Sequence, residues 1–287
     1  MGVDAGDWVM AGANKQKDMK ATAKKPTIRI LRHLARSGGT LISKCLGSMD
    51  GVVLISEIHP AVLNITNPMW QAVEWFDLVS KKQMSRWKMV RGPRFEQFVW
   101  VCAQTAESRG ETLVLRDWSH IDYYGHPFLK NPKMGSGLRD ALEDTFEIVE
   151  ACSVRHPIDQ YMSFSKFPEI PQVDMDLFFD GNLAMAEYAV GCQGGKGFVR
   201  YEDLTRDPDT KLRELCGMLD LAFDPKYSER WASYTTVTGD VRKGHGRGAG
   251  DSEIRTLERK PMDEGLLERF RADERYQRAC ALLGYEA

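Results

Sequence analysis

Ala35-Arg36-Ser37-Gly38-Gly39-Thr40-Leu41 is a basic, glycine-containing segment that stands between a strand pattern and a helix pattern. The apolar residues 27–31 before it predict a short strand, which starts just after Pro26. The apolar residues after it recur at helical spacing and predict a helix with one apolar face; they are Leu41, Ile42, Cys45, Leu46 and Met49. A turn that joins a strand to the start of a helix points backbone N–H groups at one spot, which suits a phosphate or a sulfate.

The side chains of this turn fit the same kind of ligand. Two adjacent glycines, Gly38 and Gly39, let the backbone come close to a ligand, and Arg36, Ser37 and Thr40 can add side-chain donors. Turns that join a strand to a helix in this way are common. The segment therefore predicts an anion site without identifying the anion.

The composition fits one α/β domain and argues against several other classes of protein. A chain of 287 residues with 43% hydrophobic content can bury a full core. Its formal net charge of −2 gives no basic field for nucleic acid, and no apolar run reaches the length of a membrane span or a signal peptide. The 6 cysteines show no metal-ligand spacing and fit reduced thiols. We therefore expect a cytoplasmic protein with no metal, no membrane and no nucleic-acid partner.

The first residues differ in composition from the rest. Residues 1–25 mix Gly, Ala, Asp and Lys, which predicts a flexible N-terminal tail, with a docking or oligomerisation arm as the alternative. A single domain is expected over residues 26–287.

Ionisable residues come directly after further predicted strands, which lie at 51–55, 111–115 and 146–154. Glu57 follows the first of these, and Arg116, Asp117 and His120 follow the second. In α/β sheets the carboxyl ends of the strands are where ligands bind. A carboxylate or a neutral imidazole there can act as a general base, so Glu57, His120 and Asp117 are candidates. The alternative for Glu57 is a structural pair with an arginine.

The strand at 146–154 leads into Arg155, and Pro157 then suits the first turn of a helix. Ser163 lies about two turns into that helix, so a guanidinium and a hydroxyl can converge on one phosphate. A surface salt bridge and a helix-facing hydroxyl are the alternative. Further elements are predicted as a strand and turn from 197, a helix capped by Asp207, and helices at 93–108 and 262–283.

The order of these motifs resembles the sulfotransferases that use 3′-phosphoadenosine-5′-phosphosulfate (PAPS). RSGGTL at 36–41 is similar to their 5′-phosphosulfate loop, commonly a basic residue followed by Ser-Gly-Thr/Ser-Thr. VRHPIDQYMS at 154–163 is similar to their 3′-phosphate motif, in which an Arg precedes a Ser by eight positions. YEDL at 201–204 and Arg242-Lys243-Gly244 resemble the two later motifs, so the resemblance covers about residues 27–250.

The resemblance implies a three-layer α/β sandwich, in which helices flank a central parallel sheet like that of P-loop nucleotide kinases. It implies in-line transfer of a sulfuryl group from PAPS to an acceptor hydroxyl or amine, which leaves adenosine 3′,5′-bisphosphate (PAP). Arg36 is then expected on the transferring group. The cofactor-binding residues implied are Arg36, Ser37, Gly38, Gly39, Thr40, Leu41, Arg155, Ser163, Tyr201, Arg242, Lys243 and Gly244.

The branches of this family suggest different bases. Cytosolic small-molecule members commonly have Lys where Arg36 stands and Trp where Leu41 stands, and their catalytic His follows the third strand, near His120. The tyrosyl-protein branch uses a Glu after the second strand, which corresponds to Glu57. Both residues therefore remain candidates, with Asp117 third.

Two other functions fit parts of this pattern. A P-loop kinase would want GxxxxGK[ST], and the stretch before Thr40 lacks the first Gly and the Lys. A non-catalytic nucleotide-binding module would bind PAPS without turnover. For the enzyme, the aromatic residues favour a small-molecule acceptor, which the loop predicted at 121–138 could cover. A monomer or a homodimer is expected.

Overall fold

The computed structural model describes residues 24–63, 68–89, 94–125, 129–165, 173–192, 197–239, 253–259 and 261–287. Residues 1–23 of the expected tail lie outside the described residues, as do Arg242, Lys243 and Gly244. No helix in the part of the chain that the structure describes is long and apolar enough to cross a membrane.

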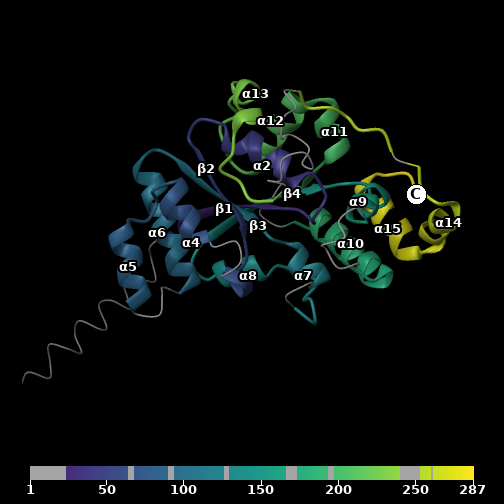
Figure 1. The fold of residues 1–287 in the computed structure, drawn as a ribbon, viewed down its shortest axis with the longest axis horizontal. Coiled ribbons are helices and arrows are strands. Elements are labelled where there is room, and N and C mark those ends of the chain that lie inside the picture. Colours follow the sequence, from purple (N-terminus) through teal and green to yellow (C-terminus); the bar gives the residue numbers. More distant parts are fainter. Residues whose placement is uncertain are drawn as a thin grey trace, which may run out of the picture.

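Within these ranges the strands form one 5-stranded parallel sheet in the order β2-β3-β1-β4-β5 (Figure 1). The strands are β1 (Thr27–Arg32), β2 (Val52–Ile58), β3 (Thr112–Asp117), β4 (Glu147–Val154) and β5 (Phe198–Arg200). In the centre, Ile30 of β1 lies opposite Leu115 of β3 on one side and Glu150 of β4 on the other. Each strand overlaps a predicted one, and the predicted parallel α/β architecture is confirmed.

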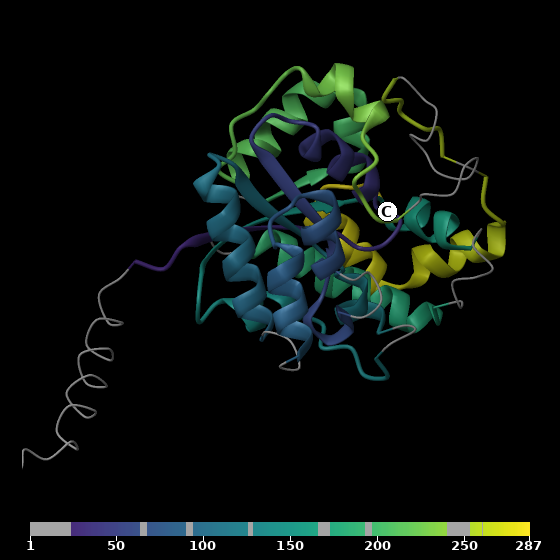
Figure 2. The same ribbon diagram turned by 60° about the vertical axis from the view of Figure 1, so that its left-hand side comes forward.

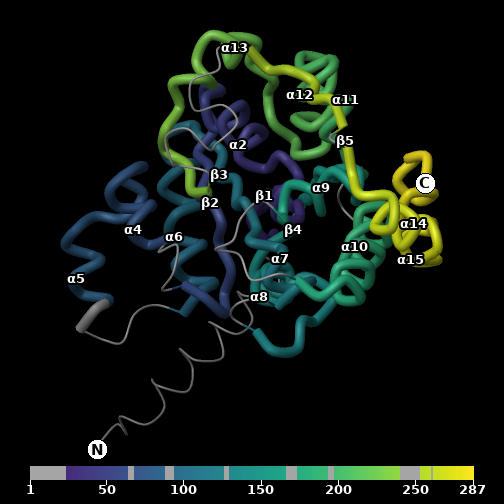
Figure 3. The backbone as a smooth tube through the Cα atoms, turned by 45° about the vertical axis from the view of Figure 1, so that its right-hand side comes forward, coloured from purple at the N-terminus to yellow at the C-terminus, as the bar shows by residue number. Residues whose placement is uncertain are grey.

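Helices connect the strands and cover both faces of the sheet. They are α2 (Gly39–Gly47), η1 (Pro60–Val62), α4 (Pro68–Trp70), the π-helix η2 (Gln71–Trp75), α5 (Lys81–Met89), α6 (Phe95–Ser108), α7 (His120–Tyr124), α8 (Gly137–Leu142), α9 (Pro157–Phe164), α10 (Met175–Val190), α11 (Tyr201–Arg206), α12 (Pro208–Met218), α13 (Tyr227–Arg230), η3 (Trp231–Ser233), α14 (Glu264–Ala272) and α15 (Glu274–Leu283). Figure 3 shows α2, α11, α12 and α13 on one side of the sheet, with α7, α8 and α10 on the other.

The alternation of side chains along the strands divides the core between these two faces. Ile30 and Leu115 pack with residues of α6 and α8, while Leu31 and Val114 pack with residues of α2 and α12. A third cluster joins the end of β4 to α10 and α15. Figure 2 shows the blue helices of residues 68–108 gathered on one flank of the sheet, away from α2. The face that carries α2 and α12 is therefore packed separately from the face that carries α6 and α8.

The C-terminal helix predicted over 262–283 is wrong in one respect, because two helices, α14 and α15, replace it. The chain breaks at Asp273, which has φ −88° and ψ 119°. Its carboxylate accepts hydrogen bonds from the backbone N–H groups of Arg275 and Tyr276. An aspartate that satisfies the first N–H groups of a new helix is a standard N-cap, and this cap outweighs the continuous apolar pattern.

The loop predicted over 121–138 is also partly wrong. Residues 120–124 form helix α7, and Tyr123 and Tyr124 are buried in the core cluster that includes α10. Helix α8 begins at Gly137, where the side chain of Ser136 caps it by accepting from the N–H of Arg139. The buried tyrosines draw residues 120–124 into the fold, so this part of the predicted loop is a packed helix.

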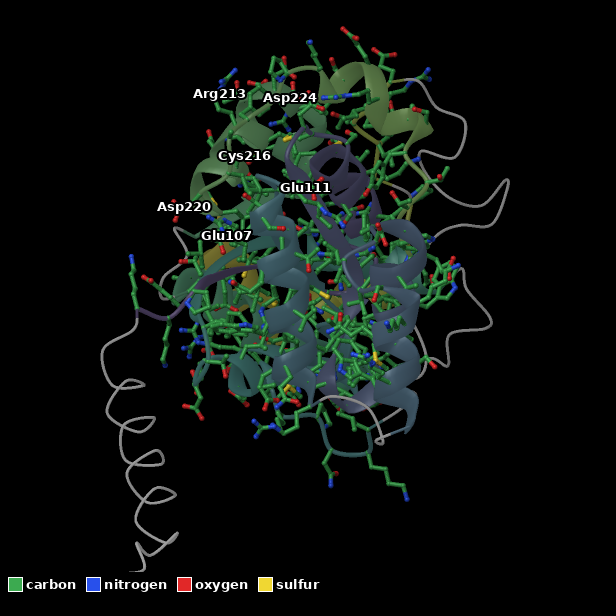
Figure 4. All side chains as sticks on the ribbon, turned by 90° about the vertical axis from the view of Figure 1, so that its left-hand side faces the viewer. Glu107, Glu111, Arg213, Cys216, Asp220 and Asp224 are labelled. Carbon is green, nitrogen blue, oxygen red and sulfur yellow. The ribbon has the colours of Figure 1, made fainter. Side chains whose placement is uncertain are left out.

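The amino-terminal edge of the sheet carries acidic side chains. Glu107 lies near the end of α6, Glu111 precedes β3 and Asp220 follows α12. Figure 4 shows Glu107 and Asp220 on the side where the chain enters β1, and Arg29 of β1 donates to the Asp220 carbonyl at 3.4 Å. The basic loop and the candidate bases lie at the opposite, carboxyl edge.

Candidate active site

The turn between β1 and α2 presents a helix N-terminus to the carboxyl edge of the sheet. Arg36 and Gly38 both have left-handed φ values, 67° and 85°, and Gly38 is the residue that precedes α2. The first N–H groups of a helix have no partner within the helix, and α2 has no acidic residue in its first turn. This end of α2 therefore suits an anion.

Two rings close the space around the glycines of the turn. A Cβ atom at Gly38 would overlap the ring of Tyr201, and one at Gly39 would overlap the imidazole of His33. The sulfotransferase loop commonly has Thr or Ser where Gly39 stands. In this protein the imidazole of His33 occupies that space, so position 39 has to be glycine.

Residues of the two predicted phosphate motifs meet at this turn. The Arg36 Nε donates to the Ser163 Oγ at 3.0 Å, and the Arg155 Nη1 donates to the Arg36 carbonyl at 3.1 Å. The Arg155 guanidinium lies over the ring of Tyr201, 4.9 Å from its centroid. Gln160 of α9 also donates to the turn, at the Ala35 carbonyl, at 2.8 Å. The ends of β1 and β4, with α9 and α11, thus bring these side chains to one place.

Glu57 reaches the same edge through a bulge in β2. Ile55 pairs with Leu115, but the next pair is Ile58 with Asp117, so β2 advances three residues while β3 advances two. Glu57 itself has a φ of 52°, in the left-handed region. Its Oε1 lies 3.2 Å from the Arg116 Nη2, and its side chain is 16% exposed. The expected alternative, a pair with an arginine, is therefore present, while part of the Glu57 side chain stays exposed.

Arg116 joins the ends of three strands to the segment that follows η3. Its Nε donates to the His33 Nε2 at 3.1 Å, and its Nη1 donates to the Ser56 Oγ and to the Thr238 carbonyl, both at 3.0 Å. Its Nη2 donates to Glu57. Since Arg116 is buried and its partners come from separate elements, it fixes their relative positions.

Gly239 lies beside both the candidate base and the loop. A Cβ atom at Gly239 would lie 3.0 Å from the Glu57 Oε1 and 3.1 Å from the Thr40 Oγ1. The carboxylate and the loop hydroxyl therefore lie near the same small residue. A group bound at the end of α2 would have Glu57 close to it.

His33 was missed in the sequence analysis, although it directly follows β1, just as Glu57 comes shortly after the strand predicted at 51–55. Burial, and then the charge of Arg116, hold the pKa of His33 well below its usual value. Its Nε2 accepts from Arg116, so the neutral ring carries its proton on Nδ1. Nδ1 has no hydrogen-bond partner among the described residues. The signal in the sequence was its place at the carboxyl end of β1.

We expect the free energy of unfolding to fall as the pH is lowered from 7 to 5. The unfolded chain protonates His33 near pH 6.5, whereas the folded chain does so only at much lower pH. Between these values the unfolded state binds more protons, so stability is lost as the pH drops below about 6.5, by at most about 1.4 kcal/mol per pH unit. Urea unfolding at pH 7, 6 and 5 measures this slope. A His33→Gln variant should be flatter, and an equally steep profile would contradict this role of His33.

The structure does not bring Asp117 to the turn. Its Oδ2 lies 3.0 Å from the Arg32 Nη1, and both side chains are fully buried. It also accepts from the Ser119 hydroxyl at 2.9 Å. Neighbouring strand residues face opposite sides, so Arg116 points to the face of α2 and Asp117 to the other face. Asp117 is therefore part of a buried ion pair and is not placed to act as a base.

Two further predicted residues take different positions. The side chain of Leu41 packs in the core beneath α2, so only its backbone faces the site. His120 begins α7, and its ring packs edge-on against Trp118 with the centroids 5.3 Å apart. His120 is close enough to His33 to help lower the pKa of that residue. It thus stays near the edge of the site.

The parallel sheet, the glycine turn at a helix N-terminus and the arginines at one edge define an α/β protein with a basic carboxyl edge. No protein-family model matches the sequence, and no curated protein matches it. Solved structures do match. The sulfotransferase domain from the curacin biosynthetic pathway has a TM-score of 0.64 and 18% identity, covering 92% of this chain and 99% of that one. The sulfotransferase domain from the Synechococcus PCC 7002 olefin synthase has a TM-score of 0.63 and 17% identity, covering 93% and 98%. The chain therefore has the sulfotransferase fold, as its motifs predicted.

Proposed function

We propose that this protein transfers the sulfuryl group of PAPS to a hydroxyl or an amine of a small-molecule acceptor. The observation that carries the proposal is the convergence of Arg36, Ser163 and Arg155, linked by contacts of 3.0 and 3.1 Å. This arrangement supports two adjoining anion sites, one at the end of α2 and one at Arg155. PAPS carries anions at both its 5′ and 3′ positions, whereas ATP carries none at the 3′ position.

The residues present fit such a nucleotide. Ser37, Gly38, Gly39 and Thr40 would hold the 5′-phosphosulfate through the first turn of α2, and Arg155 and Ser163 would hold the 3′-phosphate. Bound PAPS supplies an activated sulfuryl group. Arg36 would stabilise the charge that develops around that group, and a donor of this kind is worth about 3–4 kcal/mol in a transition state.

Glu57 would take the proton from the acceptor. It is ionisable and partly exposed, and its carboxylate and the Thr40 hydroxyl both lie beside Gly239. A base has to lie within hydrogen-bond reach of the proton that it removes, and Glu57 is the candidate whose carboxylate lies near the loop. His120, packed against Trp118, is the second candidate.

Arg155→Ala should weaken PAP binding about 10- to 100-fold, because a hydrogen bond to a charged group is worth roughly 1.5–3 kcal/mol. Adenosine 5′-phosphosulfate lacks the 3′-phosphate, so its affinity should change much less. Calorimetric titration of both nucleotides measures the difference. Arg206→Ala, which removes an exposed arginine of α11, is the matched control. Equal losses of affinity for the two nucleotides would contradict the assignment of Arg155 to the 3′-phosphate.

The reaction itself is tested by incubating the protein and PAPS with phenols, alcohols, amines and sugars. Transfer adds the mass of one SO₃ unit to an acceptor and releases PAP in equal amount. Both products should form with at least one acceptor, and both should form about 100- to 1,000-fold more slowly with Arg36→Ala. PAPS binding without any transfer would instead support a non-catalytic module.

A further inference from the structure

We propose that Gln71 is a positioning residue that holds Glu57 in its catalytic orientation; this rests on the proposed function, in which Glu57 is the base. Gln71 begins the π-helix η2, and its side chain is fully buried. It belongs to none of the sulfotransferase-like motifs. Its role follows from how β2 is built around Glu57.

A regular strand would point Glu57 into the hydrophobic core. Ile55 packs in the core cluster with α6, and in a regular strand the residue two positions later faces the same side. Instead, Ile58 returns to that core and Glu57 contacts Arg116 on the other face. The extra residue between Ile55 and Ile58 reverses the face of the sheet to which Glu57 points. The orientation of Glu57 therefore depends on the bulge.

The side chain of Gln71 holds the bulge at Ser56. The backbone N–H of Ser56 donates to the Gln71 Oε1, and the Gln71 Nε2 donates to the Ser56 carbonyl, both at 2.8 Å. Ser56 is fully buried, and an amide offers the donor and acceptor that a neighbouring strand would offer. Gln71 thus satisfies both backbone groups of the residue that immediately precedes Glu57.

The position of Gln71 is itself fixed by the π-helix. The next residue, Ala72, is fully buried in the same core as Ile55, and its carbonyl accepts from the Leu78 N–H at 2.7 Å. Helical turns of this wide kind are rare and occur frequently at functional sites. The contacts of Ala72 anchor the backbone directly after Gln71, so its amide has a defined place beside β2.

The hydroxyl of Ser56 connects the bulge to the candidate active site. Its Oγ accepts from the Arg116 Nη1 at 3.0 Å and from the Thr238 N–H at 3.2 Å. Arg116 in turn donates to Glu57. Gln71 therefore fixes Ser56 by its backbone, while Arg116 joins the Ser56 hydroxyl to the carboxylate. Glu57 is held both through its own chain and through its partner.

Crystal structures of two variants test the positioning directly. In Gln71→Leu and in the longer Gln71→Met both hydrogen bonds to Ser56 are lost. We expect Glu57 to leave its φ of 52° and to lose its 3.2 Å contact with Arg116 in both variants. If Gln71→Leu does not fold, Gln71→Met alone decides. A Glu57 unchanged in both features would overturn the proposal.

A double-mutant cycle then tests the effect on chemistry. PAP release from PAPS is measured with water and with phenol as acceptors. Gln71→Leu should lower kcat about 10- to 100-fold with an unchanged KM for PAPS, because small displacements of a catalytic group are this costly. In a Glu57→Gln background the same change should lower kcat less than about threefold, since the carboxylate that Gln71 positions is already absent.

Equal losses in the two backgrounds would show a merely structural role for Gln71. Asn182→Leu is the control, because it removes another buried amide, which donates to Tyr124 and to the Phe178 carbonyl in α10. It should affect both backgrounds alike. If the Glu57→Gln single variant keeps the full rate, Glu57 is not the base. The crystal structures of the Gln71 variants then still test whether Gln71 positions Glu57.

Discussion

Replacing Glu57 by Gln should lower turnover about 100- to 10,000-fold, the range over which a positioned general base contributes. The amide keeps the size of the side chain but cannot take a proton from the acceptor. Because Glu57 lies beside the loop and not beside Arg155 and Ser163 of the second motif, PAP affinity should stay within about twofold of the wild type. Single-turnover kinetics with saturating PAPS, together with PAP titration, measures both quantities.

His120→Asn is the comparison variant for this experiment. The imidazole packs against Trp118 and lies near His33, so its loss should lower turnover less than the loss of the Glu57 carboxylate. The opposite order would assign the base to His120. Full rates in both variants would show that neither residue takes the proton.

Arg36→Ala should lower kcat about 100- to 1,000-fold, as the removal of one donor to developing charge does in acyl transfer. The reason is its place, since Arg36 lies on the loop before α2 and touches Ser163 of the second motif. Arg36→Lys should recover part of the rate, because lysine keeps the charge but cannot offer the same planar set of donors.

Separate values of kcat and KM decide what Arg36 does. A residue that acts on the transferring group lowers kcat, whereas one that binds substrate and transition state equally raises KM alone. Melting temperatures of the variants without ligand serve as the control for folding. An unchanged kcat in Arg36→Ala would contradict its assignment to the sulfuryl group.

Much of the fold could be predicted because its signals are local. The apolar runs before Glu57, Arg116 and Arg155 lie close to the observed strands, and the turn at Gly38 directly precedes α2. The break between α14 and α15 at Asp273 was not predicted, because the apolar pattern continues across it, although the capping residue is visible in the sequence. Local pattern thus predicts elements well and their interruptions less well.

The site was harder to predict because its geometry depends on contacts between distant residues. Alternation alone could have separated Arg116 from Asp117, since neighbours on a strand face opposite sides. The same rule fails for Glu57, because the bulge in β2 turns its side chain to the face of α2. His33 and Gln71 carry no motif, and their roles come from partners far along the chain. Only the folded chain brings these partners together.

The comparison of PAP with adenosine 5′-monophosphate and ATP in thermal unfolding tests the central claim most directly. If the site holds both a 5′ and a 3′ anion, PAP at one hundred times its Kd stabilises the protein by about 2.7 kcal/mol, which is a rise of several degrees in Tm. The two other nucleotides at equal concentration should raise Tm far less, and Arg155→Ala should remove most of the difference. Equal shifts from all three nucleotides would contradict the account.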